Sequence, residues 1–176
     1  SAELFRTKSY PQVSMRSIAK KLDVKASSLY NHIQSKDEIL ESIIFKFVDI
    51  FMKTMGETSK KDINTSQKLT EIIKTHIDIA VKSPNGFATL NNDWIYLKEE
   101  KKDEFISKRI AYEKQLESIL INGMESQEIK NVNPKIMIYQ ILSPLRNIHL
   151  WNKKNYMTTS QLKSQLPQLI LKGLLN

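Results

Sequence analysis

Residues 14–40 read SMRSIAKKLDVKASSLYNHIQSKDEIL, and this stretch decides how the N-terminal part of the chain folds. Ser14 is a good N-cap for a helix predicted over 15–22, because a serine side chain accepts a hydrogen bond from the first helical turn. A turn at 23–25 separates this helix from a short second helix predicted over 26–33. Two short helices joined by a tight turn are typical of a helix-turn-helix.

The two predicted helices have distinct inner and outer faces. Ile18, Ala19 and Leu22 form the inner face of the first helix, whereas Leu29 and Ile33 lie one turn apart on the inner face of the second. In a helix-turn-helix the second helix lies in the major groove, where small and polar side chains reach base edges and phosphates. The outward residues of the second helix have this character: Ala26, Ser27, Ser28, Tyr30, Asn31 and His32.

Positive charge is concentrated in the same region of the chain. The net charge is +8, and residues 1–36 carry +5 of it, with seven basic and two acidic side chains. Lysine and arginine contacts to phosphates release counterions, which drives association with a polyanion. A basic head on a nearly neutral body therefore favours double-stranded DNA as the partner, although such a segment can also serve only as a solubilising surface.

A long helix follows the helix-turn-helix. Residues 35–38 (SKDE) have the form of an S-x-x-E capping box, which predicts a helix start, and an apolar stripe continues from there to Met55. The stretch 56–64 is polar and is predicted to be a linker. We divide the chain into a helix-turn-helix domain over 1–45 and a larger domain over 46–176, with the long helix bridging the two.

The stretch 14–40 as a whole resembles the DNA-binding signature of the TetR family of transcriptional regulators. The likeness extends over 2–45, and its most diagnostic parts are LY at 29–30, His32, and SK at 35–36. The resemblance implies a three-helix DNA-binding head and a dimer that reads a palindromic operator.

The sequence departs from the family pattern at the turn of the motif. Asp23 replaces the usual glycine, which aspartate tolerates because it can adopt a left-handed conformation, and Lys25 replaces the usual small helix cap. Ala26 and Asn31 occupy the positions that we expect to set base specificity. The residues that we expect to contact DNA are Ser14, Arg16, Lys25, Ala26, Ser27, Ser28, Tyr30, Asn31, His32 and Lys36.

The rest of the chain is rich in helix-forming residues with apolar side chains near the helical period, so an all-α fold is predicted. Residues 1–5 read as the middle of a helix, and we expect further residues upstream. The breakers at 83–86 (SPNG) should end one helix, and Pro144 and Pro167 should each kink another, because proline lacks an N–H. Beyond the linker, helices are predicted over 66–82, around Trp94 and Leu97, and over 101–124, 134–152 and 159–175.

The larger domain resembles, more loosely, the ligand-binding and dimerisation domain of a TetR branch that includes acyl-CoA-responsive repressors. This resemblance implies a small-molecule effector, with an acyl-CoA as the candidate. The apolar faces of the helices at 134–152 and 159–175 predict a homodimer that forms through these two helices. Arg109, or the lysines at 101, 102 and 108, would meet anionic phosphates. Alternatively, these basic residues are a solvated helix face and the aromatic residues ordinary core. The residues that we expect to line the ligand cavity are Phe87, Trp94, Arg109, Tyr112 and Met124.

Several functions lack the residues that they need. The chain has no cysteine, its four glycines are isolated, and no nucleophile is paired with a base, so neither an enzyme nor a cofactor is expected. His32, His76 and His149 lie on three different helices, which disfavours a metal site. We expect His76 and His149 to be hydrogen-bonded core or cavity residues, and Arg146 to be a buried or interface partner of a carboxylate.

The sequence therefore predicts a dimeric transcriptional repressor that is released from DNA by a small apolar or acyl-type effector. No apolar run is long enough to span a membrane and no signal peptide is recognisable, so a cytoplasmic location is expected. Two alternatives stay open. One is a constitutive DNA-binding protein without an effector, and the other is a carrier of apolar ligands whose head no longer binds DNA.

Overall fold

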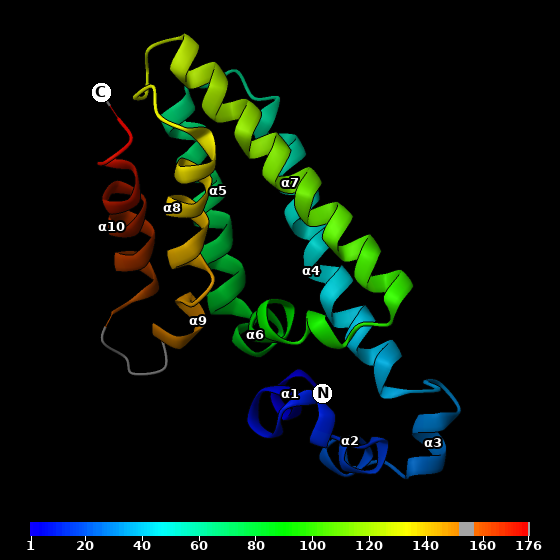
Figure 1. The fold of residues 1–176 in the computed structure, drawn as a ribbon. Helices are drawn as coiled ribbons and strands as arrows, with labels where there is room; N and C mark the ends of the chain where they lie inside the picture. The colour runs from blue at the N-terminus through cyan, green and yellow to red at the C-terminus, as the bar shows by residue number, and fades with distance from the viewer. Residues whose placement is uncertain (152–156, 176) are drawn as a thin grey trace.

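A computed structural model describes residues 1–151 and 157–175 of the chain. Within these residues the regular structure is helical, and the β-bridge between Ile129 and Leu175 belongs to no sheet. The predicted all-α fold is confirmed (Figure 1). The elements, with η marking a 3-10 helix, are α1 (Ala2–Lys8), η1 (Tyr10–Gln12), α2 (Met15–Lys21), α3 (Ala26–Tyr30), α4 (Lys36–Ser59), α5 (Thr65–Lys82), α6 (Pro84–Asn92), η2 (Trp94–Tyr96), α7 (Glu99–Glu125), α8 (Pro134–Leu145), α9 (Ile148–Trp151) and α10 (Thr159–Leu171).

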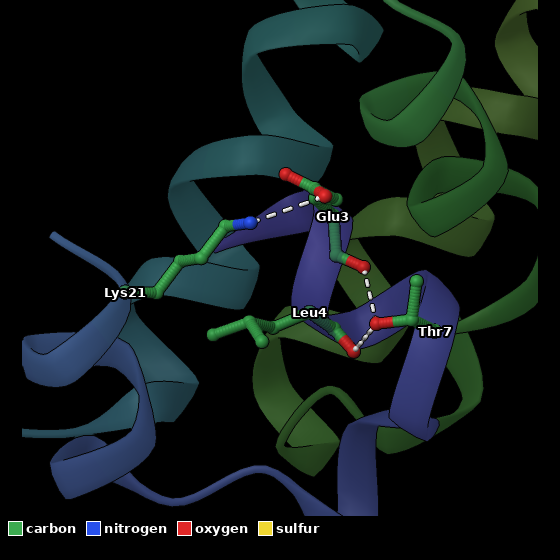
Figure 2. A network of polar contacts seen from close by, with 4 residues as sticks. All are labelled: Glu3, Leu4, Thr7 and Lys21. Atoms are coloured by element: carbon green, nitrogen blue, oxygen red, sulfur yellow. Dashed lines mark hydrogen bonds and ion pairs between the residues drawn. The ribbon is translucent and has the colours of Figure 1, made fainter.

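The head consists of α1, α2 and α3 around a small core of Phe5, Ile18 and Leu29, each at most 7% exposed. Ser14 caps α2 as predicted, and its side chain and that of Ser17 form a reciprocal capping box. Figure 2 shows how α2 is tied to α1 by an ion pair in which Lys21 Nζ lies 3.2 Å from Glu3 Oε1. Both side chains are about half exposed, so this pair contributes less than about 1 kcal/mol and the apolar core holds the head together.

The helices of the head are shorter than predicted. α2 ends at Lys21, and Leu22, which was expected to face inward, is 51% exposed because it belongs to the turn that follows. The turn passes through Asp23 at φ 55°, the left-handed conformation expected where aspartate replaces glycine. α3 ends at Tyr30 rather than at residue 33, because the chain must leave the helix to reach the extended N-cap of α4.

α4 is longer than predicted, which removes most of the expected linker. The helix continues through the polar stretch to Ser59, since Met55 and Thr58 are still buried against the body, and only 60–64 connects it to α5. The capping box at its start is only half formed. Ser35 accepts from the Glu38 amide at 3.3 Å, whereas the Glu38 carboxylate accepts from the Gln34 amide instead of that of Ser35.

The body surrounds the far part of α4 with α5, α6 and α7, and α8 to α10 cover the opposite side of α5 (Figure 1). α6 runs across the end of the body nearest the head, where α1 packs against it. The predicted break at 83–86 is very short. Ser83 ends α5 and Pro84 at once begins α6, because proline is tolerated in the first turn of a helix. Trp94 lies in the 3-10 helix η2, and Leu97 caps it.

The two C-terminal helices differ from the prediction. The expected helix over 134–152 is broken, with α8 ending at Leu145, one residue after Pro144, and α9 starting at Ile148; residue 152 itself lies outside the described residues. Pro144 itself lies inside α8, so the hydrogen bond that it lacks, to Gln140, falls before the break and not at it. Pro167 likewise lies inside α10, which ends at Leu171 rather than at residue 175.

Gly86 lets the backbone of α6 lie close to a side chain of α4. A Cβ atom on Gly86 of α6 would lie 2.5 Å from the buried ring of Phe47 of α4, whereas a Cβ on Gly56 of α4 would meet nothing within 4 Å. Because α6 separates the head from the body, this contact sets how closely α6 packs on α4.

We expect Gly86→Ala to lower the free energy of unfolding by about 1–3 kcal/mol, because the buried ring of Phe47 must move. Gly56→Ala is the matched control and should be neutral or stabilising by up to about 1 kcal/mol, since it improves helix propensity without a clash. Urea unfolding followed by circular dichroism measures both. Equal stability of the two variants would show that the Gly86 contact is not tight.

Candidate DNA-binding face and ligand cavity

The residues predicted to contact DNA gather around α3 and the start of α2. Ser27, Ser28 and Tyr30 are exposed on α3, and Asn31 and His32 are exposed in the turn directly after it rather than on the helix itself. Ser14, Arg16 and Lys25 are exposed as well, whereas Ala26 is half-buried. The structure therefore leaves these side chains accessible, and their contacts with DNA stay a prediction.

Lys36 differs from the other predicted DNA contacts. Its ammonium group donates to the carbonyl oxygens of Tyr10, Pro11 and Val13 at 3.1–3.2 Å, and it lies 4.5 Å from the centre of the Tyr10 ring. An ammonium has three donors, so all of them are used within the protein. This arrangement joins the start of α4 to the segment that leads into α2, and it gives Lys36 a structural role that the sequence did not reveal.

The head meets the body through a cluster around Tyr10. The Tyr10 ring stacks on Tyr96 of η2, with ring centres 5.4 Å apart, and its hydroxyl donates to the carboxylate of Asp37. Lys98, just before α7, lies 3.8 Å from the same carboxylate. Burial and the neighbouring Asp37 raise the pKa of Tyr10, so the phenol stays protonated and the contact is maintained at neutral pH.

A cavity of about 280 Å³ lies inside the body, between α4, α5, α6, η2, α7 and α8. Four of the five residues predicted for it, Phe87, Trp94, Arg109 and Tyr112, line it. Met124 does not, because it lies about 16 Å further along α7 than Glu113, where it packs against the core. The main apolar lining residues are Val48, Phe51, Phe87, Trp94, Phe105 and Leu142.

Two polar side chains face each other in this apolar cavity. His76 Nε2 of α5 lies 2.9 Å from the Tyr112 hydroxyl of α7, and the His76 ring lies 4.3 Å from that of Phe51 of α4. Burial lowers the pKa of His76 to about 3 and raises that of Tyr112, so both are neutral at pH 7. His149 is only 4% exposed and lies edge-on to Phe87. Both histidines therefore occupy the cavity or core, as predicted.

Charged residues border one side of the cavity. Lys108, Arg109 and Arg146 supply three cations. Two of them have a carboxylate nearby: Glu113 lies 3.4 Å from Arg109 Nε, and Glu104, outside the lining, lies 4.0 Å from Lys108 Nζ. Arg146 was expected to be a buried or interface partner of a carboxylate. It is exposed and makes no ion pair within 4 Å among the described residues, so the buried alternative is wrong and the interface alternative stays a prediction. Partial burial and the nearby Arg109 lower the pKa of Arg146. The border therefore carries a net positive charge, and a bound anion would reduce the repulsion between its cations.

The described residues contain no group of three or more histidine or carboxylate side chains arranged to hold a metal ion. Within the same residues, none of the helices combines the length and apolar character that crossing a membrane requires.

The fold joins a helix-turn-helix head, through one long helix, to a helical body with a cavity. This arrangement defines the class of one-component transcriptional regulators. Two family models match the chain in this arrangement: "Bacterial regulatory proteins, tetR family" over residues 1–43 and "Tetracyclin repressor-like, C-terminal domain" over residues 62–174. The chain belongs to the TetR family, as its resemblance predicted.

Among curated proteins, the chain is 24% identical over 130 residues to the fatty acid metabolism regulator protein of Bacillus subtilis, covering 74% of this chain and 67% of that protein. Solved structures share its fold. The regulator PfmR of Thermus thermophilus matches with a TM-score of 0.86 at 24% identity, over 99% of this chain and 96% of that one. The ketosteroid regulator KstR2 of Mycobacterium tuberculosis matches with a TM-score of 0.90 at 16% identity, over 99% and 91%.

A third structure, of AibR in complex with isovaleryl coenzyme A and operator DNA, matches with a TM-score of 0.82 at 20% identity, over 96% of this chain and 92% of that chain. These identities establish a shared fold. The effector of this chain has to be argued from its own cavity.

The buried state of His76 predicts a pH dependence of stability. Because its folded pKa of about 3 lies below the unfolded value of about 6.5, the unfolded chain binds a proton first, and stability falls as the pH decreases from about 6.5 towards 3. We expect His76→Gln to reduce this fall by up to about 1.4 kcal/mol per pH unit, measured by urea unfolding between pH 4 and pH 7.

Asp93 acts in the opposite direction, because burial raises its pKa to about 6 and its contribution to stability is lost as the pH rises towards that value. It is unchanged by the substitution at His76, so it cancels in the difference between the two proteins. The same pH dependence in both proteins would contradict a buried neutral His76.

The contacts of Lys36 predict how its loss affects DNA binding. We expect Lys36→Ala to weaken binding to all DNA sequences, because it removes the contacts that order the segment leading into α2. The salt dependence of affinity should stay unchanged. Lys25→Ala, at an exposed site, should lower the slope of log affinity against log salt by about 1, as for the loss of one phosphate contact. Fluorescence anisotropy at several salt concentrations separates the two. An equal reduction in slope would show that Lys36 leaves its carbonyl partners to bind phosphate.

Proposed function

We propose that this TetR-family regulator is a repressor that binds a palindromic operator as a homodimer and is released by a small anionic effector with a short apolar part. The observation that carries the proposal is the cavity itself, which is walled by apolar side chains and bordered by cations. Residues of α4 line this cavity, and the other end of α4 begins beside the DNA-binding face. The same helix, α4, therefore lies next to both the cavity and the DNA-binding face.

On the DNA side, phosphate contacts would position the head and base contacts would specify the sequence. We assign positioning roles to Ser14, Arg16 and Tyr30, which are exposed around the start of α2 and on α3. Asn31 and Ala26 are assigned to base reading, because an asparagine amide can pair with adenine and a small side chain allows close approach. Because the partner is chromosomal DNA, we place the protein in the cytoplasm.

For the dimer, α8 and α10 offer an apolar surface. Ile136 and Tyr139 on α8 are 60% and 56% exposed, and Leu169 on α10 is 69% exposed. α8 and α10 pack against each other, so these side chains can form one face for a second copy of the chain. A two-fold dimer would place its recognition helices about 34 Å apart, one turn of DNA.

The size and charge of the cavity define the effector class. A cavity of about 150 Å³ is enough for benzene, so about 280 Å³ suits a short-chain or aromatic acyl group but not a long fatty chain. The phosphates of a coenzyme A thioester would lie outside, against Lys108, Arg109 and Arg146. The fatty acid regulator of Bacillus subtilis and the isovaleryl coenzyme A complex of AibR support an acyl-type effector.

Release would follow from the position of α4. Val48, Phe51 and Met52 of α4 line the cavity, so a ligand there contacts the helix that carries the head. The ligand shifts the equilibrium only by its differential affinity for the DNA-bound and released arrangements, so effector and operator must antagonise each other reciprocally. A cavity with a cationic border counts against a constitutive protein without an effector, and the accessible α3 counts against a carrier that ignores DNA.

The test uses an operator selected by the purified protein and follows its release by anisotropy. We expect butanoyl-CoA and benzoyl-CoA to release the DNA, and hexadecanoyl-CoA to be weaker because its chain exceeds the cavity. Arg146→Gln should raise the effector concentration needed by about 10-fold or more, since it removes a charged hydrogen bond, without changing operator affinity. Lys114→Gln, on the exposed face of α7, is the control.

Size-exclusion chromatography with light scattering, on the same preparation, tests the dimer. If none of the thioesters releases the operator, the effector proposal is wrong and constitutive binding takes its place. A monomer at micromolar concentration would contradict the dimer.

A further inference from the structure

We infer that the His76–Tyr112 pair recognises a neutral oxygen of the effector, a carbonyl or hydroxyl group, inside the apolar cavity. This inference rests on the effector role proposed above and adds a specificity determinant to it. The pair joins α5 to α7 through the 2.9 Å contact between His76 Nε2 and the Tyr112 hydroxyl. Phe51, Phe87 and Leu142 are among the apolar side chains that line the cavity around the pair.

Counting donors shows that the pair has one hydrogen to offer. If His76 carries its proton on Nε2, that N–H donates to the Tyr112 oxygen and the phenol O–H remains available. If the proton is on Nδ1, the phenol donates to Nε2 and the Nδ1–H remains available. Within the described residues neither side chain makes another hydrogen bond. Either tautomer therefore leaves one donor that only a water or a ligand acceptor satisfies.

The charge state of the pair decides which acceptor fits. His76 is neutral, since burial lowers its pKa to about 3, and Tyr112 is neutral as well. A carboxylate placed directly against the pair would lose its hydration for at most one hydrogen bond from neutral groups, whereas at the border it could pair with Arg109 or Arg146. A neutral carbonyl or hydroxyl oxygen accepts the hydrogen bond without that cost. The anionic group belongs at the cationic border instead.

The His76–Tyr112 pair and the cationic border lie close together because both include residues of α7. Arg109 and Tyr112 are three residues apart on the same helix, so they are neighbours about 4.5–6 Å apart on one face. A ligand that uses both would carry its neutral oxygen a few bonds from its anionic end. An oxo-carboxylate has this pattern, and so does an acyl thioester, whose carbonyl lies between the acyl chain and the anionic coenzyme.

The unused hydrogen-bond donor of the His76–Tyr112 pair should give different affinities to ligands that differ by one oxygen atom. A purely alkyl ligand displaces water from the pair and leaves a buried donor without an acceptor, which costs more than a hydrogen bond contributes. Sites built around such a group therefore reject analogues that lack the partner atom far more strongly than they distinguish methylene groups.

We test this with two matched ligand pairs and the full-length chain. The first pair is butanoyl-CoA and S-butyl-CoA, which lacks the thioester carbonyl, and the second is 4-oxopentanoate and pentanoate. Affinities are measured by calorimetry and by the fluorescence of Trp94, which lines the cavity. We expect the wild-type protein to bind the oxygen-bearing member of at least one pair about 10-fold or more tightly.

The variant that removes the available hydrogen, Tyr112→Phe if the phenol carries it or His76→Leu if the imidazole does, should reduce this preference to about 1, with the affinity for the ligand that lacks the oxygen nearly unchanged. Tyr96→Phe makes the same chemical change on an exposed ring outside the cavity and should keep the full preference. Circular dichroism melts confirm that each variant is folded, and Tyr112→Phe removes only one oxygen atom.

The outcomes separate the two proposals. Equal affinity of the wild-type protein for both members of both pairs overturns the role of the His76–Tyr112 pair and leaves the effector proposal intact. A preference that survives in both Tyr112→Phe and His76→Leu also overturns that role. If none of the four ligands binds, both the proposal of an anionic effector and the proposed role of the His76–Tyr112 pair are wrong.

Discussion

The apolar face of α4 is the constraint on which the rest of the structure depends. Over its length the helix buries Leu40, Ile44, Phe47 and Met55, each at most 6% exposed, first beneath the head and then within the body. At about 1.5 Å per residue, its 24 residues span about 36 Å. One continuous helix therefore begins next to α3 and also lines the cavity. The close approach of Gly86 to this helix places α6 between the two sites as well.

The few polar groups that line the cavity determine which ligands it can distinguish. A cavity lined mainly by aromatic and aliphatic side chains would bind many apolar molecules with similar affinity, since methylene groups distinguish ligands only weakly. The His76–Tyr112 pair and the cations at the border add directional and charge requirements to this space. The junction between head and body shows the same principle. There, Tyr10 and Asp37 fix a contact that apolar packing alone would leave free to slide.

Some differences between prediction and structure have specific physical causes. The polar stretch 56–59 looked like a linker because composition was considered without partners, yet Thr58 is buried against α5 and the helix continues. Lys36 was predicted to contact phosphate, and the sequence did not show that its ammonium group also donates to three carbonyl oxygens of the protein. Met124 shares the helical period of the cavity residues on α7, but its distance along the helix axis excludes it.

The sequence by itself determined the helix-turn-helix, the all-α class and the family, because capping residues, turn chemistry and helical periodicity are local properties of neighbouring residues. It also indicated four of the five cavity residues through the resemblance. Only the tertiary structure decided that His76 faces Tyr112, that Arg146 borders the cavity, and that Lys36 is held by η1 and the residue after it. These facts depend on contacts between residues 23 to 36 positions apart in sequence, or between separate helices, and no local pattern encodes such distances.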